Sequence, residues 1–146
     1  MHPLVNARGE IRRGPGAAFD LAGVNDVTAS GTATASDGDD EGEHAPDYDR
    51  ALEGRDPSRP VILLAHQPIQ VHESARHGVD LQLSVHTHGG QMFPFHGLVR
   101  LQQPVLSGLH RFGDTQLFVT TGAGFWGPPV RVGAPPEIAV VRLARA

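Results

Sequence analysis

Two histidines lie one residue apart, directly before a pair of glycines, in the stretch Val85-His86-Thr87-His88-Gly89-Gly90. An extended backbone directs residues i and i+2 to the same side, so we expect His86 and His88 to point both imidazoles at one place. Gly89 and Gly90 carry no Cβ, which permits a sharp turn or a close approach to a ligand. The pattern predicts a metal site at the end of a strand.

A third histidine, His66, follows the apolar run 61–65, just as His86 follows the run 79–85. Residues 72–78 between them fit one or two helical turns. This order predicts two parallel strands joined by a right-handed crossover. The carboxyl ends of parallel strands share one edge, where open α/β sheets bind ligands, so we expect His66 to lie beside His86 and His88. Three converging neutral imidazoles would suit zinc, iron, nickel or copper.

The other six histidines fall in segments predicted to be terminal, polar, helical or loop-like, and we interpret them as structural: His2, His44, His72, His77, His96 and His110. Short alternations and turn signals predict the remaining elements. These are a hairpin at 4–13 with its turn at 7–10, a strand at 17–24, a helix at 47–54, a loop at 92–97, a hairpin of strands 109–112 and 116–121, an irregular loop at 122–129 and a last strand at 137–143.

The segment 28–46 is small and polar at first and then acidic. It cannot bury enough apolar surface to order itself, so we expect a flexible loop. Three acidic residues and a glycine fall near the spacing of a calcium-binding EF-hand loop: Asp37, Asp39, Glu41 and Gly42. Tyr48 stands where that loop requires a bidentate glutamate, and no helical pattern precedes the run, so the solvated loop is favoured.

The composition excludes several classes of function. A chain of 146 residues suits a single domain, here one spanning 1–146, and its net charge of −4 comes without a basic stripe, so an electrostatic footprint for nucleic acid is missing. The absence of cysteine excludes disulfides, thiolate metal ligands and a thiol nucleophile. No apolar run approaches the roughly 18 residues that cross a bilayer, and the N-terminus lacks a secretory pattern. We therefore expect a cytoplasmic location, unless an export or membrane segment is missing from this chain.

A cupin barrel is an alternative that also presents His-x-His on a strand. Cupins place a glutamate a few residues after the pair, where this chain has Gly89-Gly90-Gln91-Met92-Phe93-Pro94. That departure disfavours the cupin interpretation.

Three pieces of the sequence together resemble the calcineurin-like metallophosphoesterases: Ile62-Leu63-Leu64-Ala65-His66-Gln67-Pro68, Gly78-Val79-Asp80-Leu81-Gln82-Leu83-Ser84 and His86-Thr87-His88-Gly89-Gly90-Gln91. They are most similar to the bacterial branch of the pattern LxHxP…DLxLSGHTHGGQ. The segments 19–26 and 122–138 are similar to parts of that branch as well, so the likeness covers most of the chain.

The resemblance implies an α/β (α+β) chain forming the C-terminal half of a four-layer αββα sandwich. It also implies two divalent metal ions, of the manganese, iron or zinc type, that activate a water for attack on phosphorus. Carried over by residue, His66 and His86 would bind one ion and His88 the other. The implied substrate is a phosphate ester of a small molecule or a lipid, and the resemblance does not predict an oligomeric state.

Two departures from the family pattern stand out. Val85 replaces the glycine that precedes the first motif histidine, and we expect its side chain to crowd the site and weaken metal affinity. The motifs Asp-x-His, Gly-Asp-x-x-Asp and Gly-Asn-His, which supply the remaining ligands and the catalytic histidine, do not occur in the sequence. We therefore expect a truncated phosphoesterase, weakly active or inactive alone, with no catalytic residue of its own.

Two other interpretations stay open. The chain is alternatively a metal-binding or interaction module that uses His66, His86 and His88 without catalysis, or a remnant without a defined fold. The amount of metal bound per chain separates these possibilities.

Overall fold

The computed structural model describes residues 3–14, 16, 18–28, 45–92, 96–125 and 127–144, with only the backbone at His96. Its strands are β1 (Ala7–Arg12), β2 (Ala18–Gly23), β3 (Val61–Leu64), β4 (Leu81–Ser84), β5 (Gly108–Phe112) and β6 (Thr115–Val119). Its helices are α1 (Tyr48–Leu52), α2 (Val71–Arg76) and α3 (His96–Gln102), with short 3-10 turns η2 (Pro68–Gln70) and η3 (His88–Gly90). No helix among the described residues is long and apolar enough to cross a membrane.

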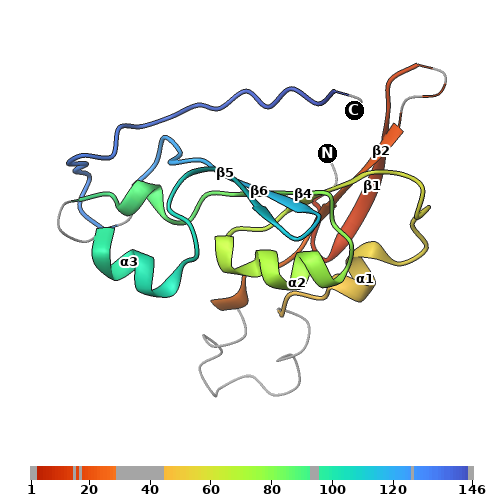
Figure 1. Ribbon diagram of the computed structural model, residues 1–146, viewed down its shortest axis with the longest axis horizontal. Coiled ribbons are helices and arrows are strands. Elements are labelled where there is room, and N and C mark those ends of the chain that lie inside the picture. The colour runs from red at the N-terminus through yellow and green to blue at the C-terminus, as the bar shows by residue number, and fades with distance from the viewer. Residues whose placement is uncertain are drawn as a thin grey trace.

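All six strands form one mixed sheet in the order β1-β2-β3-β4-β6-β5 (Figure 1). The central strands β2, β3, β4 and β6 are parallel, and β1 and β5 pair antiparallel at the two edges. The predicted crossover is confirmed, because β3 and β4 pair in parallel, with Ile62 opposite Leu81, and α2 joins them. The fold is therefore of the mixed α/β class that the sequence predicts.

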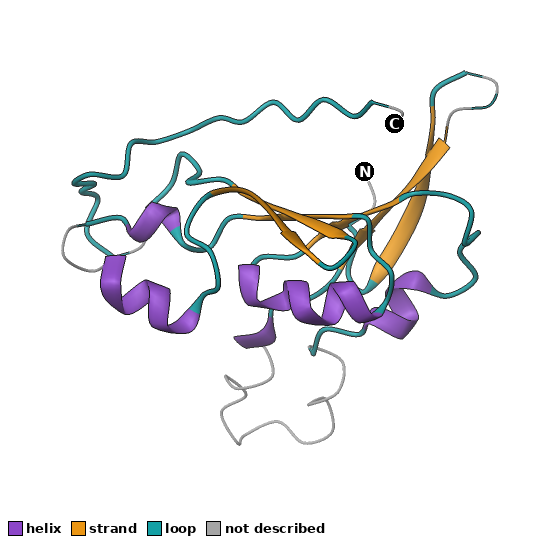
Figure 2. Cartoon of the chain, in the orientation of Figure 1, coloured by secondary structure: helices purple, strands orange, loops and turns teal. Residues whose placement is uncertain are grey.

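The helices α1, α2 and α3 lie on one side of the sheet (Figure 2). Alternate strand residues point into the core on that side, and Val61, Leu63, Leu117 and Val119 are fully buried there. Such alternation is what a half-covered sheet requires. At the amino ends of the parallel strands the buried carboxylate of Asp20 lies 3.4 Å from Arg8 and 3.2 Å from Arg59. The functional residues lie at the other end of these strands.

The opposite face of the sheet carries a continuous apolar row. Leu64, Leu83, Phe118 and Leu109 lie opposite one another in neighbouring strands. Leu64 is 41% exposed and Leu109 is 61% exposed. In the view of Figure 1, the extended C-terminal stretch is the segment on this side of the sheet. The described chain thus supplies one sheet and one layer of helices, two of the four layers of the expected sandwich.

The predicted hairpin at 4–13 is wrong. Residues 7–12 form a single strand, β1, which pairs with β2 from Ala7 opposite Gly23 to Arg12 opposite Ala18. The turn follows at the glycines, since Gly14 and Gly16 have φ angles of 66° and 91°. Positive φ is where glycine is favoured, so the stronger turn signal was the Gly-Pro-Gly segment.

The predicted last strand at 137–143 is also wrong. This segment is extended, but no described strand pairs with it, and Ile138 and Val140 are 89% and 93% exposed. An alternating apolar sequence becomes a strand only when a neighbour offers main-chain hydrogen bonds. In the loop predicted at 92–97, residues 93–95 lie outside the described part, and α3 begins at His96.

The other predicted elements are confirmed: the strand 17–24 as β2, the helix 47–54 as α1, the helix 72–78 as α2 and the hairpin of 109–112 with 116–121 as β5 and β6. The predicted loop 28–46 lies largely outside the described residues, as does the acidic run of the calcium interpretation. Tyr48 is 7% exposed and its hydroxyl donates to the carbonyl of Gln70 at 3.4 Å. Its side chain is therefore part of the core.

Candidate metal centre

His66 and His86 lie side by side beyond the carboxyl ends of β3 and β4. The N–H of Val85 donates to the carbonyl of His66 at 3.2 Å, which continues the pairing of the two strands. His86 Nδ1 lies 3.1 Å from His66 Nε2, and the rings meet edge to face with centroids 4.9 Å apart. The convergence that the crossover predicts is therefore present for these two histidines.

The backbone from His86 to Gln91 is a tight turn, which corrects the expected extended presentation. β4 ends at Ser84, and His86, His88 and Gln91 have positive φ angles of 27°, 46° and 45°. Positive φ is uncommon outside glycine and marks strain that surrounding structure must hold. Thr87, 1% exposed, anchors the turn by donating from its hydroxyl to the carbonyl of Leu106 at 2.6 Å.

Gly89 is required in this turn by close packing. A Cβ built there would lie 3.0 Å from Thr121 Cγ2, and φ is +65°. Val85 makes a comparable contact, since its Cγ2 would lie 2.9 Å from a Cβ at Gly122. The side chain of Val85 is thus accommodated because residue 122 is a glycine. The expected effect of Val85 on metal affinity remains a prediction.

His88 faces Arg131, on a different side from the paired histidines. Arg131 Nη2 lies 3.1 Å from His88 Nδ1 and donates to the carbonyl of Thr121 at 2.9 Å. Arg131 Nη2 carries two hydrogens and also contacts the carbonyl of Gly124, so its contact with His88 does not fix which ring nitrogen carries the proton. His88 lines the same cleft as His66 and His86 but belongs to a separate hydrogen-bonded group.

The sequence prediction missed Asp26, which follows β2. Its Oδ2 lies 3.8 Å from His66 Nε2, and the potential ligand atoms of Asp26, His66 and His86 all lie within 4.8 Å of one another. Asp26 follows a strand that is parallel to β3, so the edge argument that found the histidines applies to it too. What the sequence did not reveal is that β2 and β3 pair, across a connection of 37 residues from 24 to 60.

The electrostatics of the site favour neutral imidazoles beside an ionised carboxylate. Burial lowers the pKa of His86, and the neighbouring His66 lowers it further. Burial likewise lowers the pKa of His88, with a contribution from Arg131. Burial alone would raise the pKa of Asp26, but hydrogen bonds from Thr28 and Gln67 outweigh it and lower that pKa. Neutral imidazole and carboxylate are the protonation states that bind metals.

A cleft of about 680 Å³ opens at these residues. It is lined on one side by His66, His86 and His88, and elsewhere by Leu98, Val99 and Gln102 of α3 and by Gln103, which follows the helix. The cleft therefore combines side chains that are candidate metal ligands with an apolar surface.

Comparison with curated proteins finds close relatives. A protein of Helicobacter pylori named as an uncharacterised metallophosphoesterase is 54% identical over 103 residues, covering 69% of this chain and 28% of the relative. One of Campylobacter jejuni with the same description is 45% identical over 126 residues, covering 86% of this chain and 31% of the relative. The chain belongs to the calcineurin-like metallophosphoesterase family. A bovine protein named as a transmembrane protein with a metallophosphoesterase domain is 37% identical over 129 residues, 86% of this chain and 28% of that protein.

The chain spans less than a third of the length of each of these three relatives. No family model and no solved structure matches it. The family resemblance expected from His66, His86 and His88 is therefore confirmed at the level of the family, while the ligand set itself remains a prediction.

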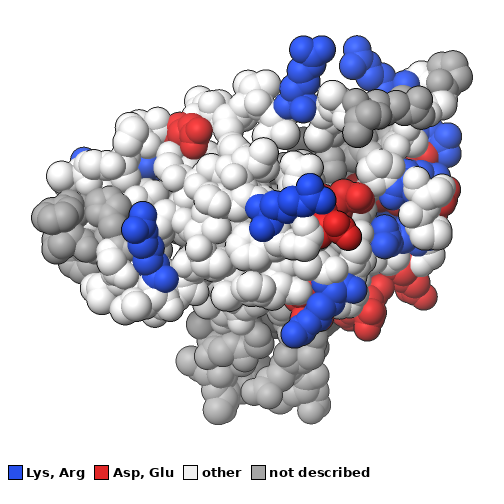
Figure 3. All heavy atoms as spheres, viewed as in Figure 1, with Lys and Arg blue, Asp and Glu red and all other residues white. Residues whose placement is uncertain are grey.

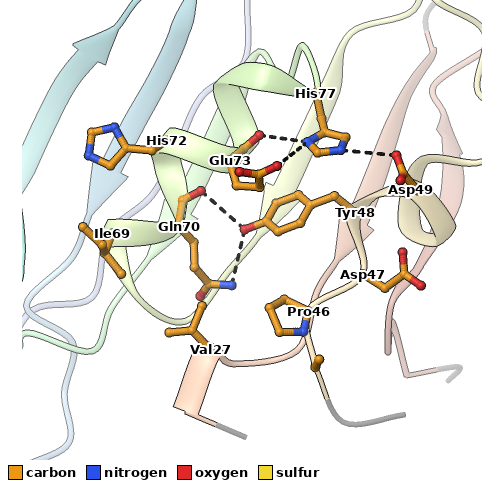
Figure 4. Close-up of a pocket in the computed structure, with 11 residues that line it drawn as sticks. Val27, Pro46, Asp47, Tyr48, Asp49, Ile69, Gln70, His72, Glu73 and His77 are labelled. Carbon is orange, nitrogen blue, oxygen red and sulfur yellow. Dashed lines mark hydrogen bonds and ion pairs between the residues drawn. The ribbon is translucent and has the colours of Figure 1, made fainter. Parts of the chain in front are cut away.

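A second pocket, of about 710 Å³, lies between α1 and α2 (Figure 4). Its polar groups are paired with one another. His77 contacts the carbonyl of Glu73 at 3.0 Å and the carboxylate of Asp49 at 3.3 Å, and it stacks on Tyr48. Within the described part of the chain, the only group of three metal-ligating side chains is Asp26, His66 and His86.

The remaining histidines that the structure describes have structural contacts, as expected. His72 meets Phe112 edge to face with centroids 5.5 Å apart, and His110 Nε2 lies 2.9 Å from the carbonyl of Ser107. On the face shown in Figure 3, acidic and basic side chains are intermingled over β1, β2, α1 and α2, and few occur around α3.

Proposed function

We propose that this chain contributes to a metal-dependent phosphoester hydrolase, with His66 and His86 as ligands of one divalent ion and His88 as a ligand of a second. The observation that carries the proposal is the 3.1 Å approach of the His66 and His86 ring nitrogens at the carboxyl edge of parallel strands. When bound, two divalent ions supply Lewis acidity toward the phosphoryl oxygens and acidify the attacking water.

The residues of this chain have distinct parts in that proposal. The strained turn fixes where the His86 ring lies, and Thr87 holds the turn to the 105–107 segment. Arg131 fixes the ring of His88 and places a permanent positive charge 3.1 Å from it. If Nε2 of a neutral His88 binds a metal, Nδ1 carries the proton and cannot accept a hydrogen bond from Arg131.

We further propose that the chain by itself hydrolyses phosphoesters weakly or not at all. The family motifs Asp-x-His, Gly-Asp-x-x-Asp and Gly-Asn-His are absent from its 146 residues, so the carboxylate that bridges two ions is not supplied. The test is turnover of an aryl phosphodiester by the purified chain with added manganese. We expect a rate at the level of a His66→Ala, His88→Ala double variant. Robust turnover that His88→Ala abolishes would contradict this expectation.

The apolar wall of the cleft supports a substrate whose ester group is apolar. Leu98 lines the cleft and is 60% exposed, so its side chain is open to contact by a ligand. We propose a phosphate ester of a small molecule or a lipid, with its apolar part against α3 and its phosphate toward His66 and His86.

A metal-binding module without catalysis is the second candidate. The specific observation in its favour is that Asp26, His66 and His86 come together within this chain. Elemental analysis tests it: one ion retained per purified chain, without phosphodiester turnover, supports the module, and a chain free of metal supports neither candidate.

A further inference from the structure

We infer that Asp26 is a metal ligand and that, with His66 and His86, it forms a divalent-cation site completed by this chain alone. The inference rests on the proposed function only in that His66 and His86 bind metal. It adds a carboxylate from β2 that the predicted ligand set lacks.

The distances are close to those of a formed site. Ligand atoms about 2.0–2.1 Å from an ion in tetrahedral geometry lie roughly 3.3–3.4 Å from one another. His66 Nε2 lies 3.1 Å from His86 Nδ1 and 3.8 Å from Asp26 Oδ2. All three ligand atoms lie within 4.8 Å of one another, so movements of about an ångström or less in each side chain would bring them onto one ion.

Asp26 is held in place by a chain of buried amides. Gln67 Nε2 donates to Asp26 Oδ1 at 2.5 Å, and the N–H of Thr28 donates to the same oxygen at 3.0 Å. Gln67 is in turn fixed by Gln103, whose Nε2 donates to Gln67 Oε1 at 3.0 Å. Gln67 and Gln103 are 5% and 6% exposed. These two bonds fall on Oδ1, while Oδ2 lies 3.8 Å from His66 Nε2. Such outer partners are what orient a ligating carboxylate.

The donor set defines the class of ion. Two neutral imidazoles and one carboxylate bind Zn²⁺ in hydrolytic enzymes and Fe²⁺ in oxygenases, in both cases with positions left for water or substrate. His88 does not belong to this set, because the group of ligand atoms within 4.8 Å of one another comprises Asp26, His66 and His86, and the His88 ring contacts Arg131 instead.

The test is titration of the complete, metal-free chain with Zn²⁺ by calorimetry, together with the visible spectrum of the Co²⁺ form. We expect one ion per chain. Asp26→Asn keeps the size and shape of the side chain, and we expect it to weaken binding by at least about tenfold, the lower end of what losing even an outer partner costs. We also expect it to change the Co²⁺ spectrum. The matched control His110→Ala removes an imidazole that does not line the cleft. It should change the affinity for this ion less than about twofold, and circular dichroism should show each variant folded.

Three results would overturn the inference. If Asp26→Asn binds like the unchanged chain while His66→Ala does not, Asp26 is no ligand and the histidine proposal stands. If His88→Ala weakens binding as much as Asp26→Asn, the ion is held by a different set. If the unchanged chain binds neither Zn²⁺ nor Co²⁺, the inference and the proposed function fail together.

Discussion

At the scale of single residues, the site depends on side chains that never reach the cleft. Gln67 is such a residue, because it donates to Asp26 and accepts from Gln103. We predict that Gln67→Leu lowers Zn²⁺ affinity by about tenfold, within the range for outer-sphere partners of metal ligands. Thr115→Val is the control, since Thr115 is also a buried polar residue, 2% exposed, but its hydroxyl donates to the carbonyl of Val79 at 2.6 Å. Equal losses in both variants would mean that general destabilisation, not orientation of Asp26, is responsible.

The shifted pKa of His86 makes the stability of the metal-free chain depend on pH. Burial and His66 hold the pKa of His86 below its ordinary value, so the folded state favours the neutral ring. The stabilisation from this shift is present above the unfolded pKa of about 6.5 and is lost as pH falls through the folded pKa. We predict that the His86 ring of the metal-free chain titrates below the histidines of the urea-unfolded chain when followed by NMR, and that Zn²⁺ stays bound at pH 6. A His86 titration at or above the unfolded value would contradict this.

At the scale of elements, the sequence was informative where contacts are local. The runs 61–65 and 79–85 are adjacent in sequence and in the sheet, so the position of His66 beside His86 followed from their pattern. Asp26 was missed because the partner of β2 is far along the chain. Helix α3 was not predicted. Its leucines Leu98 and Leu101 are exposed, so the sequence does not show the apolar stripe of helical period that a helix packed on a core has. The segment 137–143 alternates as a strand does, but no described strand pairs with it.

The exposed leucines of helix α3 lead to a prediction about ligand binding. Leu98 lines the cleft, and Leu101 on the same helix is 82% exposed and does not line it. We predict that the Zn²⁺-loaded chain binds alkyl phosphates more tightly as the chain lengthens, by up to about fourfold per methylene, the value of about 0.8 kcal/mol for burying one CH₂ group. Leu98→Asn should flatten this dependence and Leu101→Asn should preserve it, as measured by calorimetry. Binding of inorganic phosphate without any dependence on chain length would rule out the apolar wall as a substrate surface.

At the scale of the whole molecule, the feature to explain is the uncovered face of the sheet. Its apolar row runs across four strands, from Leu64 through Leu83 and Phe118 to Leu109. Monomeric proteins rarely expose apolar patches larger than a few hundred Å². The Helicobacter pylori and bovine relatives are more than three times as long as their matching regions. They therefore have additional residues that can cover this face.

In a solution of the purified 146-residue chain, other copies of the chain are available to cover this face. We predict that it self-associates through this face and binds a hydrophobic dye, as measured by light scattering after size exclusion and by dye fluorescence. The double variant Leu64→Lys, Leu109→Lys should shift the chain toward monomer, because association would bury two charges. Leu101→Lys, which adds charge at an exposed leucine on the helical side, should leave the assembly unchanged. Since the substituted residues lie outside the Asp26, His66 and His86 group, Zn²⁺ binding should survive in both variants. A monomeric chain that binds no dye would show that this face is covered by segments of the chain itself.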